Sequence, residues 1–98
     1  MTQTALNGIV TLTPNTWTLI SENNCTFTNE GASAVEIRGD TSTPEVTEFG
    51  VTYQPGQCEA LEIGTLARYG GVTATGIYAI SRKSSISGRL FVSRAAVA

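Results

Sequence analysis

Short segments in which apolar and polar residues alternate recur along the chain, separated by turns rich in Gly, Pro and Asn. In one of them Cys25 and Phe27 alternate with threonines, and after a polar break the same alternation resumes through Val35 and Ile37. A period of two is typical of strands that bury one face. The two runs therefore predict a β-hairpin over residues 24–38.

Six further segments have strand-like sequences, and turn signals separate them. They span residues 8–13, 16–21, 49–53, 58–63, 76–81 and 88–93. The clearest turn signal is Gln54-Pro55-Gly56-Gln57, with Pro and Gly at the second and third positions as in a type II turn. We expect the strands beside it to form a second hairpin. Many short strands with regular turn signals predict an all-β protein, an antiparallel β-sandwich of about eight strands that is jelly-roll-like.

A chain of 98 residues has the length of one domain with a thin two-sheet core. Residues 1–7 are polar and aperiodic, so we expect them to form an N-terminal arm that becomes ordered against a partner. Residues 8–98 then form a single β-sandwich domain. The longest predicted loop is the glycine-rich stretch 64–76, and loops of this length in small domains are usually functional or contact-forming.

Two strands near the C-terminus are apolar on both faces. In residues 76–81, Tyr78 and Ile80 lie on the face opposite Ile77, and in residues 88–93 Phe91 faces away from its apolar neighbours. A strand of this kind is either central in the fold or covered by another subunit.

The aromatic residues fall into two groups. Four lie on plausible inward-facing positions of predicted strands, so we expect them in the core: Trp17, Phe27, Phe49 and Tyr53. Tyr69 differs, because it lies beside Arg68 in the glycine-rich loop. An Arg-Tyr pair in such a loop favours an interface or a ligand contact.

Charge is sparse and unevenly distributed. Charged residues make up 14% of the chain and the net charge is −2. Residues 1–67 hold all the acidic residues and one basic residue, whereas residues 68–98 hold the remaining basic residues. Either the two parts are neighbours that compensate each other within a subunit, or one surface is basic and another acidic, which would favour contacts between copies. The basic residues lack an aromatic ladder or a known motif, so we expect no nucleic acid partner.

Catalytic chemistry is thinly represented. The chain has no histidine, which excludes Ser-His-Asp or Cys-His nucleophilic systems and imidazole metal ligands. The carboxylate pairs Glu45/Glu48 and Glu59/Glu62 are interpreted as solvated surface acids. We therefore expect a protein that is not an enzyme and that needs no cofactor and no metal.

The two cysteines and the hydrophobicity give weaker constraints. Cys25 and Cys58 lie too far apart in the sequence for a C-x-x-C redox or zinc site. They are either two buried thiols or a disulfide, and the sequence leaves both open. The N-terminus lacks a secretory signal pattern and no apolar run approaches the ~20 residues of a membrane span. We expect a soluble protein without a membrane partner.

The order of these segments resembles that of small virion structural proteins of tailed bacteriophages. The similarity covers most of residues 8–95, and its best pieces are residues 29–37, 53–56 and 77–81. Proteins that look like this are β-sandwich subunits attached to the phage head or to fibres and adaptors of the particle, usually as oligomers and commonly as trimers. The resemblance implies no active site.

The resemblance, added to the predicted β-sandwich, implies a head decoration (cement) protein on the exterior of the virion. It would bind the major capsid protein or another virion protein and self-associate as a homotrimer. The residues expected at these contacts are Ile9, Arg68, Tyr69, Tyr78, Ile80 and Phe91. The arm would reach across a capsid or subunit seam. Two alternatives stay open: a tail or fibre adaptor subunit, and a carbohydrate-binding module.

Overall fold

The computed structural model describes residues 3–61, 74–82 and 88–97, and these form eight strands and no helix. The strands are β1 (Gln3–Leu12), β2 (Thr18–Ser21), β3 (Cys25–Asn29), β4 (Val35–Asp40), β5 (Val51–Tyr53), β6 (Cys58–Leu61), β7 (Gly76–Ile80) and β8 (Gly88–Val97). The predicted all-β fold is confirmed.

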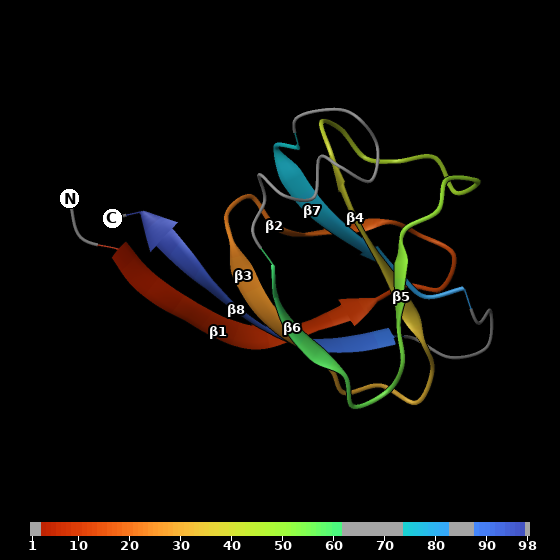
Figure 1. Ribbon diagram of the computed structural model, residues 1–98, viewed down its shortest axis with the longest axis horizontal. Coiled ribbons are helices and arrows are strands. Elements are labelled where there is room, and N and C mark those ends of the chain that lie inside the picture. The colour runs from red at the N-terminus through yellow and green to blue at the C-terminus, as the bar shows by residue number, and fades with distance from the viewer. Residues whose placement is uncertain (1–2, 62–73, 83–87, 98) are drawn as a thin grey trace.

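The strands form two four-stranded sheets that pack together as a β-sandwich. Sheet 1 has the order β1-β8-β3-β6 and sheet 2 the order β2-β7-β4-β5, with antiparallel neighbours throughout. Among consecutive strands in the described ranges, only β4 and β5 pair with each other. This order is that of an eight-stranded jelly roll. Figure 1 shows β1 and β8 side by side, carrying the two ends of the chain.

Both predicted hairpins are wrong, because the links cross between the sheets. Strand β3 belongs to sheet 1 and β4 to sheet 2, and β5 and β6 are divided in the same way. The type II turn itself is present: the Gln57 amide donates to the Gln54 carbonyl at 3.1 Å, and Gly56 has a φ of 88°. A period of two identifies the buried face of a strand but does not say which sheet the strand joins.

The core lies between the sheets, with Phe27 at its centre. The Phe27 ring is fully buried and meets the Tyr53 ring edge to face, with centroids 4.8 Å apart. The inward residues of both sheets complete this cluster: Leu12, Ile20, Cys25, Val35, Ile37, Leu61, Ile77, Ala79, Leu90 and Val92. The inward-facing apolar residues of the alternating strands thus form the core, with one layer from each sheet.

One buried polar side chain holds the link between β3 and β4. Asn29 Nδ2 donates to the carbonyls of Ser33 at 3.0 Å and Tyr53 at 3.1 Å. Its Oδ1 accepts from the Gly31 amide at 3.0 Å. Because a buried polar group is costly unless it is paired, this amide fixes the path by which the chain leaves sheet 1.

Residues 3–7, set apart in the sequence as an arm, continue strand β1. Ten consecutive residue pairs join β1 to β8, from Gln3 opposite Val97 to Leu12 opposite Gly88. Strand β3 accompanies β8 only as far as the pair Cys25–Arg94. The last three pairs of the β1–β8 ladder therefore extend beyond the third strand of the sheet.

Replacing Asn29 should test whether its amide stabilises the crossing. We expect Asn29→Ala to lower the free energy of unfolding by about 2–3 kcal/mol, because three backbone groups lose their partner inside the protein. Thr26→Ala, at an exposed position of the same strand, should change it by less than about 0.5 kcal/mol. Urea unfolding monitored by circular dichroism measures both. Equal midpoints for the two variants would contradict this role.

Candidate interaction surface

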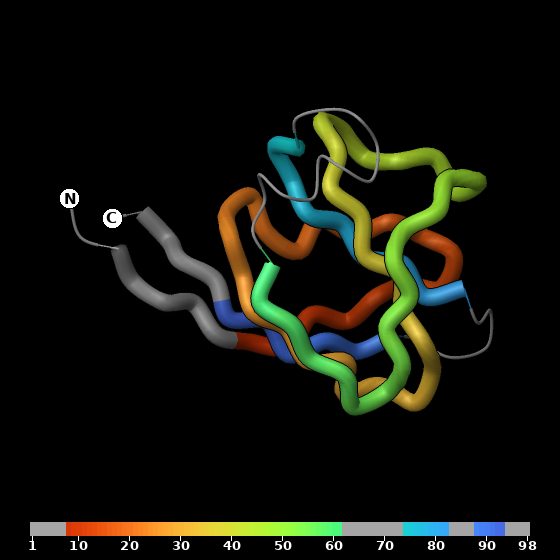
Figure 2. Tube along the Cα trace, in the orientation of Figure 1, coloured from red at the N-terminus to blue at the C-terminus, as the bar shows by residue number. Residues whose placement is uncertain are grey.

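The outer face of sheet 2 is covered at β7 by the chain itself. Tyr78 and Ile80 on β7 form a second buried cluster with Trp17. The loop 41–50 runs from β4 to β5 (Figure 2), and Trp17 of this cluster donates through Nε1 to the Glu45 carbonyl in that loop at 2.9 Å. Strand β7 is therefore buried on both faces within one subunit.

Arg82, just after β7, ties this loop to the sheet. Its Nε forms an ion pair with Glu36 Oε2 at 2.5 Å, and its Nη1 donates to the Val46 carbonyl at 2.6 Å. The guanidinium lies 5.7 Å from the centre of the Trp17 ring and 5.5 Å from that of Phe49. Such positions over aromatic faces add cation–π attraction to the hydrogen bonds. Arg82 therefore connects the loop, β4 and the Trp17 ring.

A second arginine, Arg38 on β4, contacts both ends of the same loop. Arg38 Nε lies 3.0 Å from Asp40 Oδ2, and Arg38 Nη1 donates to the Phe49 carbonyl at 2.8 Å. Burial acts to raise the pKa of Asp40, but hydrogen bonds from the Thr41 amide and from Arg38, together with the charge of Arg38, outweigh it and lower this pKa. The carboxylate is thus stabilised in its charged form.

The burial of each side chain shows which of the predicted contact residues are accessible to a partner. The side chains of Tyr78 and Ile80 are buried beside Trp17 and are not accessible to a partner of the folded subunit. Arg68 and Tyr69 lie outside the described residues. Phe49, expected in the core, is 74% exposed, because β5 begins only at Val51 and leaves the ring above Arg82.

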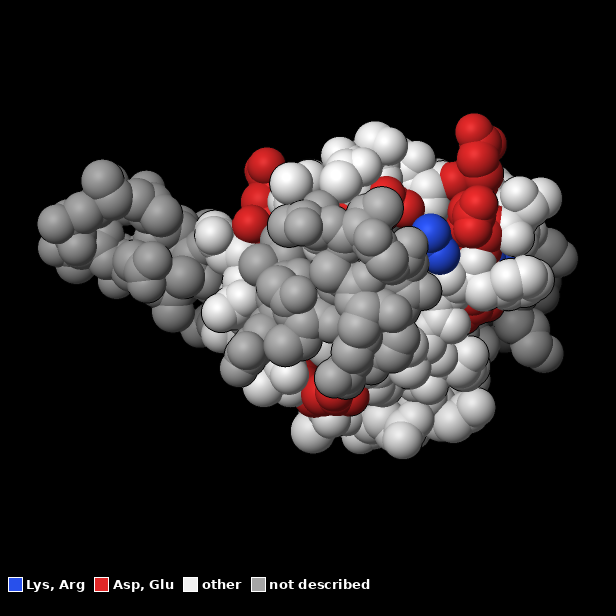
Figure 3. Space-filling view, turned by 45° about the horizontal axis from the view of Figure 1, so that its top comes forward, with Lys and Arg blue, Asp and Glu red and all other residues white. Residues whose placement is uncertain are grey.

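Charges from the two parts of the chain meet within the subunit. Arg82 pairs with Glu36, and Arg89 Nε lies 4.0 Å from Glu30 Oε1. On the face drawn in Figure 3, the visible Lys and Arg atoms lie beside acidic ones. For these pairs, the acidic and basic parts of the chain are neighbours that compensate each other within one subunit.

The outer face of sheet 1 differs from that of sheet 2. The strand registers place Ile9, Phe91, Thr28 and Cys58 side by side in one row across four strands. Ile9 is 44% exposed and Phe91 is 37% exposed, and they lie directly opposite each other on β1 and β8. An exposed aromatic residue beside an exposed branched aliphatic residue is the kind of pair found in the centre of interfaces.

The neighbouring row extends this surface with small uncharged residues. Ser93, Thr26 and Ala60 lie next to one another in the registers of β8, β3 and β6. Thr26 and Ala60 are exposed and Ser93 is half-buried. We call these three residues, together with the row of Ile9, Phe91, Thr28 and Cys58, the sheet-1 surface. Neither of its rows contains a charged residue.

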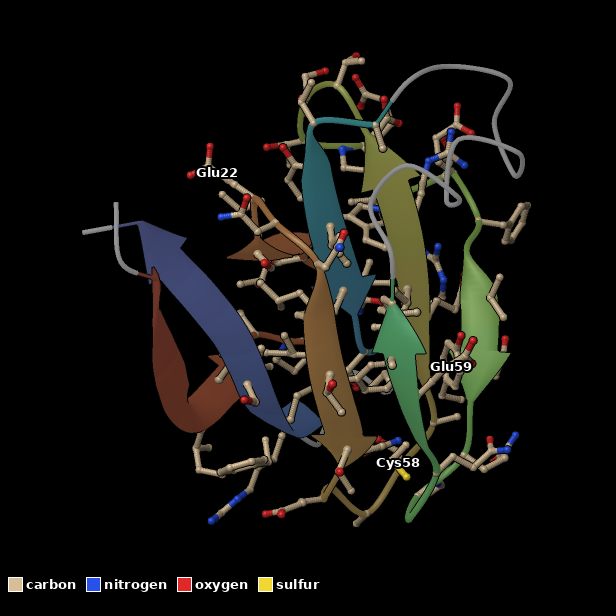
Figure 4. All side chains as sticks on the ribbon, turned by 60° about the vertical axis from the view of Figure 1, so that its left-hand side comes forward. Glu22, Cys58 and Glu59 are labelled. Atoms are coloured by element: carbon tan, nitrogen blue, oxygen red, sulfur yellow. The ribbon has the colours of Figure 1, made fainter. Side chains whose placement is uncertain are left out.

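The two cysteines point to opposite sides of sheet 1. Cys25 is buried in the core, whereas Cys58 is exposed on β6 in the row of Phe91. They are not joined by a disulfide. Figure 4 shows Cys58 and Glu59 at successive positions of β6, with Glu22 in the link between β2 and β3. The expectation of two buried thiols is correct for Cys25 only.

Other site types find little support in the described ranges. A depression of about 130 Å³ lined by Leu19, Ile20, Ser21 and Glu22 is smaller than the ~300–1,000 Å³ of typical small-molecule sites. Among the described residues no three His, Cys, Asp or Glu side chains are grouped to hold a metal ion. The described part of the chain also contains no helix with the length and apolarity to span a membrane.

Comparison with known proteins identifies no relative. No protein-family model, no curated protein and no solved structure matches this chain. Function is therefore inferred from the strand order and from the surfaces of the two sheets. On the outer face of sheet 2, loop 41–50 and Trp17 cover β7, while Leu19 beside Tyr78 is 46% exposed. The sheet-1 surface, with its two uncharged rows, is the candidate for binding.

Removing Arg82 should loosen loop 41–50. We expect Arg82→Ala to destabilise the protein by about 1–3 kcal/mol, because Glu36 and the loop carbonyls lose a charged partner. Amides of residues 41–50 should exchange with solvent faster, and the fluorescence of Trp17 should shift to longer wavelength. Arg89→Ala is the matched control, since its exposed ion pair is worth at most about 1 kcal/mol. Unchanged exchange in Arg82→Ala would refute the attachment.

Acid should weaken the Arg38–Asp40 contact. The pKa of Asp40 is lower in the folded protein than in the unfolded chain, so the carboxylate contributes stability at pH above its ordinary value, about 3.9. This contribution is lost as the pH falls through the folded-state pKa. Urea midpoints at pH 6 and pH 3 should therefore differ less in Asp40→Asn than in the unmodified protein. Identical differences would show that Asp40 does not carry this effect.

Proposed function

We propose that this chain is a bacteriophage virion structural protein, a head decoration protein that binds the capsid surface and neighbouring copies. The observation that carries the proposal is the sheet-1 surface, two rows of uncharged residues with the exposed Ile9–Phe91 pair at the β1–β8 end of one row. Such rows are suited to burial against another protein, because they hold no charged side chain that would have to be desolvated. Arg89, exposed on the same face of β8, borders them.

The strand order adds support by analogy. Double-sheet jelly rolls occur in viral capsid domains and also in lectin domains. The same architecture serves unrelated functions, so the fold alone favours neither class. The resemblance of the sequence to small virion proteins favours the first.

The proposed mechanism is static binding. Each subunit would place the sheet-1 surface on a capsid protein, and symmetric repetition would let many modest contacts act together. Bound subunits would stabilise the assembled capsid by mass action, because they bind the assembled state in preference to its free components.

Two other functions compete with decoration. A tail or fibre adaptor would use the same surface in a ring with fewer copies per particle. A carbohydrate-binding module would use an exposed aromatic ring, and Phe49 in the polar loop 41–50 is such a ring. Glycan binding that disappears in Phe49→Ala or Tyr69→Ala would favour the carbohydrate-binding alternative.

Purified particles provide the direct test. Tailed phage particles produced from the genome that encodes this chain should contain the protein by mass spectrometry after density-gradient purification. Decoration predicts a copy number comparable with that of the major capsid protein, and a reconstruction should place the jelly roll on the outside of the head. A copy number near that of tail proteins favours the adaptor. Absence from homogeneous particles overturns both.

Polar substitutions in the exposed pair should weaken attachment. We expect the double variant Ile9→Ser and Phe91→Ser to bind particles that lack the protein at least about tenfold more weakly, because the centre of the apolar contact is lost. Val46→Ser is the control, since Val46 is similarly exposed but lies in the loop over sheet 2. Co-sedimentation with particles measures both. Equal binding by the two variants would exclude the sheet-1 surface as the contact.

A further inference from the structure

The four edge strands of the sandwich are protected very unequally. An exposed strand edge offers unpaired N–H and C=O groups, and proteins usually protect such edges by short strands, bulges, charges or prolines. At the edges of sheet 2, β2 has four residues with a shift of register between Leu19 and Ser21, and β5 has three residues and is followed at once by a turn containing Pro55. At one edge of sheet 1, β6 has four residues including Glu59.

Strand β1, at the other edge of sheet 1, has none of these protections. It runs for ten residues, Gln3–Leu12, with an unbroken register against β8, and its sequence QTALNGIVTL contains no charge and no proline. Among the described strands, only β8 pairs with it. A long, regular and uncharged edge of this kind is a site for pairing with another strand.

The far end of the β1–β8 ladder is the second observation. Strand β3 pairs with β8 only up to Arg94. The three β1–β8 pairs from Ala5–Ala95 to Gln3–Val97 lie beyond that point, so only two strands are present there. Figure 1 shows this two-stranded ribbon reaching away from the sandwich. A two-stranded ribbon is marginally stable in water, and additional strands are what stabilise it.

We infer that the β1 edge is a homodimer interface, in which β1 of one copy pairs antiparallel with β1 of a second copy. An uncharged strand can pair with itself without like charges coming together, which a strand carrying charges of one sign cannot do. The pairing is isologous, since the same edge is used on both subunits. It converts each projecting two-stranded ribbon into part of a four-stranded one, with the order β8-β1-β1-β8.

This geometry deepens the proposed function, on which its biological meaning rests. Antiparallel edge pairing places the two-fold axis perpendicular to the sheet, so the outer faces of both copies point the same way. The sheet-1 surfaces of two subunits then lie on one face of the dimer. The dimer would bind a capsid with two Ile9–Phe91 pairs at once, which raises its effective affinity. The resemblance implies trimers, whereas isologous pairing gives two copies, and the mass separates these expectations.

A lysine in the middle of β1 tests the interface. Gly8 is exposed, and an added Cβ there would meet no atom within 4 Å, so Gly8→Lys is compatible with the folded subunit. In the dimer two lysines would lie near the axis and repel each other. Ala60→Lys is the matched control, because it adds the same charge at an exposed position of β6, on the opposite edge of sheet 1.

Sedimentation equilibrium of the purified full-length chain, without phage particles, gives the result. We expect twice the subunit mass of 10.3 kDa for the unmodified protein and for Ala60→Lys. Gly8→Lys should raise the dimer dissociation constant about tenfold or more, with an unchanged circular dichroism spectrum. Amides of residues 3–12 in the unmodified protein should exchange more slowly at high than at low concentration, and this measurement does not depend on the variant folding.

Several results would overturn the inference: a monomer at all concentrations, a trimer, a dimer that survives Gly8→Lys, or a dimer that Ala60→Lys dissociates equally well. Since these measurements use the isolated protein, they are independent of the particle experiments. A dimer that is absent from virions leaves the interface intact and refutes the proposed function. A monomer that decorates particles refutes the dimer interface and supports the proposed function.

Discussion

The two-sided burial of β7 is the constraint from which much of this structure follows. Ile77 and Ala79 face the core, while Tyr78 and Ile80 face outward, so apolar side chains on both sides must be removed from water. Sheet 1 provides one cover and loop 41–50 the other. Since the loop is polar, it is held by arginine contacts to its backbone rather than by a second apolar layer. The outer face of β7 is thereby closed to partners, whereas Ile9 and Phe91 on the outer face of sheet 1 stay exposed.

Local pattern was enough to predict the strands. The period of two located eight strands, and the residues Pro55 and Gly56 located a turn that has the expected hydrogen bond. The arrangement of the strands was less accessible, because alternation is a property of one strand and its two faces. Whether Val35 continues the sheet of Phe27 or crosses to the other is decided by the geometry of the whole sandwich. Both hairpin errors have this single cause.

The candidate surface was predictable in part. Phe91 was predicted at a contact because it adds an apolar side chain on the second face of its strand, and the register places it opposite Ile9, the other predicted contact residue. Tyr78 and Ile80 show the same pattern, yet a loop of the same chain covers them. Sequence alone does not show whether the apolar outer face of a strand is covered by a loop of the same chain or by another subunit. The one available signal was the pair Arg38 and Arg82, which flank polar loops and can hold backbone carbonyls.

The placement of the two cysteines has a practical consequence. Cys58 presents its sulfur to solvent on the same face as Phe91, whereas Cys25 lies between the sheets. A maleimide fluorophore would therefore attach to the native molecule at β6 and report when that face becomes occupied. The inner thiol would become reactive only when the sandwich opens. One reagent could thus follow docking and unfolding separately in the same sample.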